Sequence, residues 1–155
     1  MSTPRPIIAA ASLLAALASH GALAEFDPCE ILKLEEVNTI AGVPATKMRA
    51  NTTKQGLECS FLDSRQNAVL TAEIRPAKLP KAELDLEAEN LQKIYRTSVK
   101  PVEVGDGGFW LNSKQELFFR KGKNIVRVVM APGTDAKATQ ARTESIGRLI
   151  ESRIK

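Results

Sequence analysis

The apolar residues of this chain follow helical spacing in some segments and alternate with polar residues in others. Helical spacing, bounded by Asp, Pro or Gly residues typical of helix ends, predicts helices over 28–41 and 81–97 and a third that begins after Thr134 or Asp135. Strand-like stretches, several with an apolar residue at every second position, cover 46–50, 57–61, 70–75, 99–104, 116–120 and 124–130. The pattern therefore predicts the order αβββ-αβββ-α.

This order predicts the fold class. Strands joined by short links pair antiparallel, and Lys121-Gly122-Lys123 is typical of a tight hairpin between the last two strands. A helix with one apolar stripe must cover a sheet face, and the last helix is expected to bury Ala138, Ala141, Ser145 and Leu149 with Ile146, Ile150 and Ile154 alongside. We expect an α+β fold with a single antiparallel sheet of about six strands and helices packed on it.

The first 24 residues have the three-part plan of an export signal. Arg5 precedes an uncharged apolar run over 7–18, and small residues at Ala22 and Ala24 suit signal-peptidase cleavage. The alternative, a retained membrane anchor, needs about 20 apolar residues, and this run is shorter. The sequence predicts a cleavable signal peptide over 1–24, one domain over 25–155, a periplasmic or secreted location and no transmembrane segment after cleavage.

Two cysteines, Cys29 and Cys59, remain in the mature chain. In an oxidising compartment an even count in so short a chain predicts a disulfide bond, and with two cysteines only one pairing exists. The alternative is a pair of unpaired buried thiols. Their wide spacing, without further cysteine or histidine, is not that of a zinc site.

The composition argues against catalysis. His20, the only histidine, lies in the predicted signal peptide, so the mature chain lacks the usual general base and the commonest transition-metal ligand. The Gly105-Asp106-Gly107-Gly108 stretch lacks the Lys and Ser or Thr of a phosphate loop and indicates a turn. We expect a non-enzymatic protein with no cofactor and no metal; a carboxylate-based hydrolase is the third alternative.

Charge and aromatic residues suggest where a partner would bind. Residues 25–95 carry 9 basic and 12 acidic residues, a net charge of −3, whereas residues 96–155 carry 12 basic and 6 acidic residues, a net charge of +6. The candidate partner-binding residues are the densest basic stretch and the nearby aromatic pair: Arg120, Lys121, Lys123, Phe109 and Trp110. The basic residues suit an anionic envelope component such as a lipid headgroup, lipopolysaccharide or an acidic protein. The plainer alternative for the basic residues is a solubilised hairpin edge, and for the aromatic pair it is core packing. Nucleic acid is disfavoured as a partner by the exported location.

Five short stretches carry a resemblance: Asp27-Pro-Cys-Glu-Ile-Leu, the following Glu35-Glu-Val, Glu58-Cys-Ser-Phe, Val104-Gly-Asp-Gly-Gly-Phe-Trp and Leu117-Phe-Phe-Arg-Lys-Gly. Together they resemble small, cysteine-paired bacterial envelope proteins and lipoproteins, some of them similar to the PsbP-like α/β/α sandwich. The chain departs from that group in lacking a Cys after its signal and in carrying Lys33 where a Thr or Ser helix cap is common. The resemblance implies a fold and an envelope location but no activity.

The function expected from these observations is that of a binding or accessory module acting by surface recognition, with an unknown protein or an anionic envelope component as its partner. The alternative is a protein inhibitor, such as an immunity protein against an envelope-targeted toxin.

Overall fold

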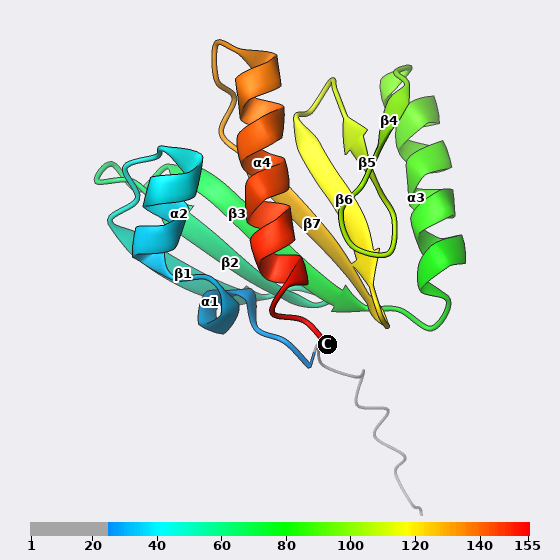
Figure 1. Ribbon diagram of the computed structural model, residues 1–155, viewed down its shortest axis with the longest axis horizontal. Helices are drawn as coiled ribbons and strands as arrows, with labels where there is room; N and C mark the ends of the chain where they lie inside the picture. Colours follow the sequence, from blue (N-terminus) through cyan, green and yellow to red (C-terminus); the bar gives the residue numbers. More distant parts are fainter. Residues whose placement is uncertain (1–24) are drawn as a thin grey trace, which may run out of the picture.

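Seven strands pair antiparallel in one sheet, as the computed structural model of residues 25–155 shows (Figure 1). The predicted signal peptide, residues 1–24, lies outside the described residues. The strands are β1 (Lys47–Thr52), β2 (Leu57–Leu62), β3 (Ala68–Pro76), β4 (Val99–Val102), β5 (Gly108–Leu111), β6 (Glu116–Lys121) and β7 (Asn124–Met130). Their order across the sheet is β1-β2-β3-β7-β6-β5-β4, so β3 and β7, far apart in the sequence, meet at the centre.

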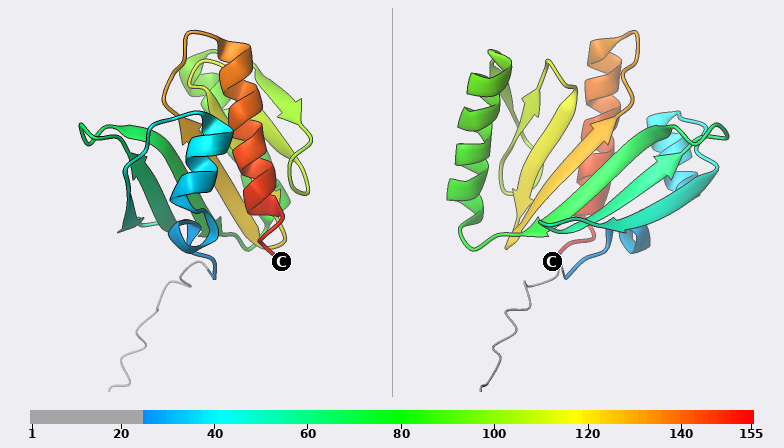
Figure 2. Two further views of the ribbon diagram at one scale, coloured as in Figure 1. Left: turned by 60° about the vertical axis from the view of Figure 1, so that its left-hand side comes forward. Right: turned by 180° about the vertical axis from the view of Figure 1, so that it is seen from behind.

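The helices divide between the two faces of the sheet. On the inner face lie α1 (Pro28–Ile31), α2 (Leu34–Ala41) and α4 (Ala136–Glu151), which close the main core over β2, β3, β6 and β7. On the outer face α3 (Pro80–Tyr95) packs against β5, β6 and β7, where Leu84 meets Phe109, Phe118 and Ile125. Seen from behind, no helix stands in front of the outer face of β1, β2 and β3 in the part of the chain that the structure describes (Figure 2).

The single antiparallel sheet and the mixed α+β class are confirmed, but the predicted strand count and element order are wrong. The missed strand is β5, where Phe109, Trp110 and Leu111 are all buried. Because α3 packs on one face of β5 and Trp110 joins the inner core on the other, the strand is buried on both faces and has no alternation of apolar and polar residues. The first predicted helix is also two helices, α1 and α2, which are separated by the buried Leu32 and by Lys33, the N-cap residue of α2.

Helix α4 buries part of the predicted stripe: Ile146 and Ile150 are buried, as is Ile154 just beyond the helix, but threonines take the place of the predicted alanines. Its buried residues are Thr139, Thr143, Ile146, Gly147 and Ile150, whereas Ala138, Ala141 and Ser145 are not buried. The two threonines satisfy their hydroxyls within the helix by donating to the carbonyls of Asp135 and Thr139, at 2.9 and 2.8 Å. Gly147 allows close packing, since a Cβ there would lie 2.6 Å from Leu117 Cδ2.

The predicted disulfide bond between Cys29 and Cys59 is confirmed. Asp27 caps α1, its carboxylate accepting a hydrogen bond from the Cys29 N–H at 2.8 Å. Cys59 is fully buried on the inner face of β2. The bond therefore fastens the first turn of the described chain onto the sheet.

Candidate functional site

The predicted basic residues lie at the end of β6, which carries Arg120 and Lys121, and in the turn to β7, which carries Lys123; Asp106 binds this turn. Gly122 adopts a left-handed conformation with φ of 56°, and its N–H donates to the Asp106 carboxylate at 2.8 Å. This hydrogen bond, with the nearby charges of Lys121 and Arg120, lowers the pKa of Asp106. The turn is therefore held in place by an ionised carboxylate.

The three predicted basic residues do not act as one cluster. Arg120 is paired with Ile125 across the strands, on the face that carries α3. Lys121 points to the other face, where it forms ion pairs with Asp106 at 3.6 Å and Glu151 at 3.8 Å. Because both partners neutralise Lys121, the cations of this turn without an ion-pair partner among the described residues are Arg120 and Lys123.

The fold brings two further cations, which the sequence analysis missed, to the same place. The β3–β7 pairing runs to Pro76 opposite Asn124, and the Ala77 N–H donates to the Lys123 carbonyl at 2.8 Å. The chain then continues through Lys78 into α3, beside the β6–β7 turn (Figure 1). A hollow of about 390 Å³ results, lined by Lys78, Leu79, Pro80, Lys81, Ala82, Asp85, Arg120 and Gly122.

We call Lys78, Lys81, Arg120 and Lys123 the cationic corner. Lys78 and Lys123 also line a neighbouring hollow of about 510 Å³, so the four residues surround one region of surface. Lys81 pairs with Asp85 at 2.7 Å, while Lys78, like Arg120 and Lys123, has no ion-pair partner in residues 25–155. Three of the four cations are thus free to meet an anion.

Glu83 fixes the backbone of the corner. Its carboxylate accepts hydrogen bonds from the N–H groups of Lys78 and Leu79 at 3.0 and 3.1 Å, satisfying donors at the start of α3. The same carboxylate lies 3.5 Å from the Arg75 guanidinium on β3. The segment before α3 is therefore bound to the sheet, and the side chains that it presents start from a defined backbone.

The aromatic candidates are buried. Trp110 is 1% exposed within the inner core, and Phe109 stacks on Phe118 under α3 with ring centroids 4.9 Å apart. Core packing, the plainer of the two interpretations, is what the structure shows for both residues. Neither side chain offers an apolar surface to a partner in this conformation.

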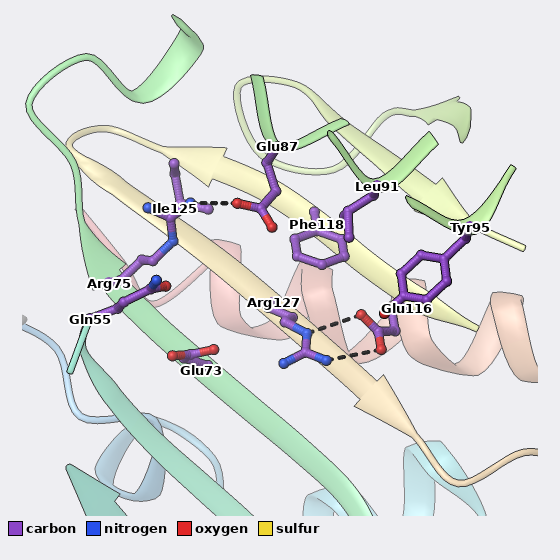
Figure 3. A pocket seen from close by; sticks show the side chains of 10 residues that line it. All are labelled: Gln55, Glu73, Arg75, Glu87, Leu91, Tyr95, Glu116, Phe118, Ile125 and Arg127. Atoms are coloured by element: carbon purple, nitrogen blue, oxygen red, sulfur yellow. Dashed lines mark hydrogen bonds and ion pairs between the residues drawn. The ribbon is translucent and has the colours of Figure 1, made fainter. Parts of the chain in front are cut away.

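A further hollow, of about 240 Å³, opens where α3 borders the uncovered outer face (Figure 3). Arg127 donates to both oxygens of Glu116 at 2.9 and 3.0 Å, and Arg75 lies 3.4 Å from Glu87. Burial alone would lower the pKa of Arg127, but the hydrogen bonds to Glu116 and the nearby charges of Glu73 and Glu58 raise it. Both guanidinium groups of this hollow are therefore already satisfied by carboxylates of the chain.

The residues that line these hollows include carboxylates and lysines but no histidine. Residues 25–155 contain no histidine, and no group of three metal-ligating side chains occurs among them. Within the same residues, no helix combines the length and the apolar character that crossing a membrane requires. What these hollows offer a ligand is charge, hydrogen bonding and, at the corner, the apolar side chain of Leu79.

No protein-family model matches the chain, and no curated protein matches it either. The resemblance to exported, cysteine-paired envelope proteins therefore stays a prediction.

Proposed function

We propose that the mature chain is a non-enzymatic binding module of the periplasm or the extracellular space, which recognises an anionic partner by surface contact at the cationic corner. The observation that carries the proposal is the convergence of Lys78, Arg120 and Lys123, three cations without an ion-pair partner among the described residues. They come from the segment before α3 and from the β6–β7 turn, which the pairing of β3 with β7 places together.

Charge balance favours this corner over the hollow beside Arg127. The corner holds four cations, and among the described residues only one of them, Lys81, has an ion-pair partner, Asp85. Around the other hollow each guanidinium group already has a carboxylate partner. An incoming anion would have to displace a partner there, whereas at the corner it meets unpaired cations.

The disulfide bond supports the proposed location, because such bonds persist in oxidising compartments outside the cytosol. The absence of histidine from residues 25–155 supports a binding role over an enzymatic one.

The test is capture of partners from an envelope extract on immobilised protein of residues 25–155. The parent is compared with Lys78→Ser/Arg120→Ser/Lys123→Ser, and with the control Lys47→Ser/Arg65→Ser/Lys137→Ser, which removes the same charge from exposed residues on other elements. We expect one or more partners to be retained by the parent and the control and lost from the corner variant. Partners that all three proteins retain equally would show that recognition occurs elsewhere. A captured envelope-targeted toxin would point to the inhibitor alternative.

A further inference from the structure

An exposed leucine stands among the cations of the corner. Leu79 directly precedes α3, its side chain lines the same hollow as Lys78, Lys81 and Arg120, and the residue is 68% exposed. The apolar side chain thus faces solvent at the point where unpaired positive charge is concentrated. We propose that the cationic corner docks on an anionic lipid surface, with Leu79 inserted among the headgroups; this inference rests on the proposed function.

The backbone around Leu79 is prepared for such insertion. Pro80 fills the first position of α3, where its missing N–H costs nothing, and Glu83 holds the N–H groups of Lys78 and Leu79. Because the backbone is already ordered, docking requires ordering of side chains alone, which reduces the entropic cost of binding.

The electrostatics match a surface that carries phosphate groups. Each cation near an anionic membrane surface contributes about a fivefold gain in binding. Lys78, Arg120 and Lys123 are available for this contact, and the nearby carboxylates of Asp85 and Asp106 are occupied by Lys81 and Lys121. One apolar side chain ringed by cations is suited to a membrane interface, since apolar insertion and headgroup pairing then act together.

The remaining exposed apolar residues of α3 do not fit this role. Leu86 is 56% exposed, but it lies among the acidic residues Asp85, Glu87 and Glu89; Ile94, 68% exposed, lies in the last turn of α3, at the far end of the helix from the corner. An anionic surface would repel those carboxylates. The proposed contact is therefore at the end of α3 that carries Leu79, and Leu86 serves as a matched control.

Co-sedimentation with vesicles tests the docking. The probes are phosphatidylcholine vesicles with and without phosphatidylglycerol, at about 50 and about 300 mM salt, where screening of exposed charges differs strongly. In a parallel experiment without lipid, calorimetry measures binding of the soluble polyphosphate inositol hexakisphosphate. The proteins are the parent, the corner variant Lys78→Ser/Arg120→Ser/Lys123→Ser, its control Lys47→Ser/Arg65→Ser/Lys137→Ser, Leu79→Ser and Leu86→Ser; circular dichroism verifies that each is folded.

We expect the parent to bind only the vesicles that contain phosphatidylglycerol, and less at high salt. The corner variant should lose about 100-fold in vesicle binding, at about fivefold for each cation, and the charge control should lose far less. Leu79→Ser should weaken vesicle binding several-fold without changing binding of inositol hexakisphosphate, and Leu86→Ser should behave like the parent.

Equal vesicle binding by Leu79→Ser and the parent would overturn the proposed insertion. If the parent bound inositol hexakisphosphate but not the vesicles, the membrane inference would fail and recognition of an anionic partner would stand. Binding of neither probe would contradict both proposals.

Discussion

Removing the bond between Cys29 and Cys59 releases the first turn of the described chain from β2. The bond spans 30 positions of the sequence, and the loop-closure model values such a link at about 3.5 kcal/mol. Helix α1 has only four residues, whereas an isolated helix needs about 12–15 residues to be even marginally stable. We therefore expect Cys29→Ala/Cys59→Ala to lower the free energy of unfolding by about 3–4 kcal/mol and to loosen α1 first.

Urea denaturation followed by circular dichroism measures the first effect, and hydrogen exchange at residues 28–31 measures the second. Reduction of the parent protein provides a control that changes no residue, and it should reproduce the loss seen in the double variant. Parent and variant free energies within about 0.5 kcal/mol of each other would refute the argument, because the tether would then contribute far less than its loop length implies.

Three further predictions concern the core, a turn and the response to acid. Trp110→Ala should lower the free energy of unfolding by about 3–5 kcal/mol in urea titrations, as expected for a large core side chain, and a loss below about 1 kcal/mol would contradict its burial. Gly105→Ala should cost more than about 1 kcal/mol in the same assay, because φ is +66° and the new Cβ would lie 2.2 Å from the Arg120 carbonyl oxygen; unchanged stability would contradict this geometry. Hydrogen bonds from Arg153 lower the pKa of Glu36 from 4.5 to about 2, so the pair stabilises the fold fully above pH 4.5 and loses its contribution as the pH falls toward 2. The urea midpoint of Glu36→Gln should therefore fall less between these pH values than that of the parent, and parallel curves would contradict the pairing.

The periodicity of the sequence predicted elements well where one face of an element is buried and the other is wet. Strand β3, with Leu70, Ala72 and Ile74 buried on the inner face, follows its predicted alternation. The same reasoning missed β5, which is covered on both faces, and it placed alanines in the buried stripe of α4 where Thr139 and Thr143 lie instead. A threonine that donates its hydroxyl to its own helix can be buried, and hydropathy patterns do not register this.

The candidate site could be predicted only in part, because its residues come from segments that only the tertiary structure brings together. Arg120 and Lys123 are visible as a basic stretch, but Lys78 joins them through the pairing of β3 with β7, which local patterns do not encode. The neutralisation of Lys121 likewise depends on Glu151, which α4 brings across the inner face. Sequence spacing identified where positive charge is dense, and the tertiary pairing determined which of these charges are free.

The most direct test of anion recognition at the cationic corner is a nitrogen-15 NMR titration of residues 25–155 with inositol hexakisphosphate. The account predicts that the largest amide shifts fall at residues 78–83 and 120–123 and are lost when salt is raised, because exposed charges are then screened. The amides of β1 and β2 on the uncovered part of the sheet should move little. Largest shifts in β1 and β2, or no saturable shifts at all, would contradict the assignment of the site to this corner.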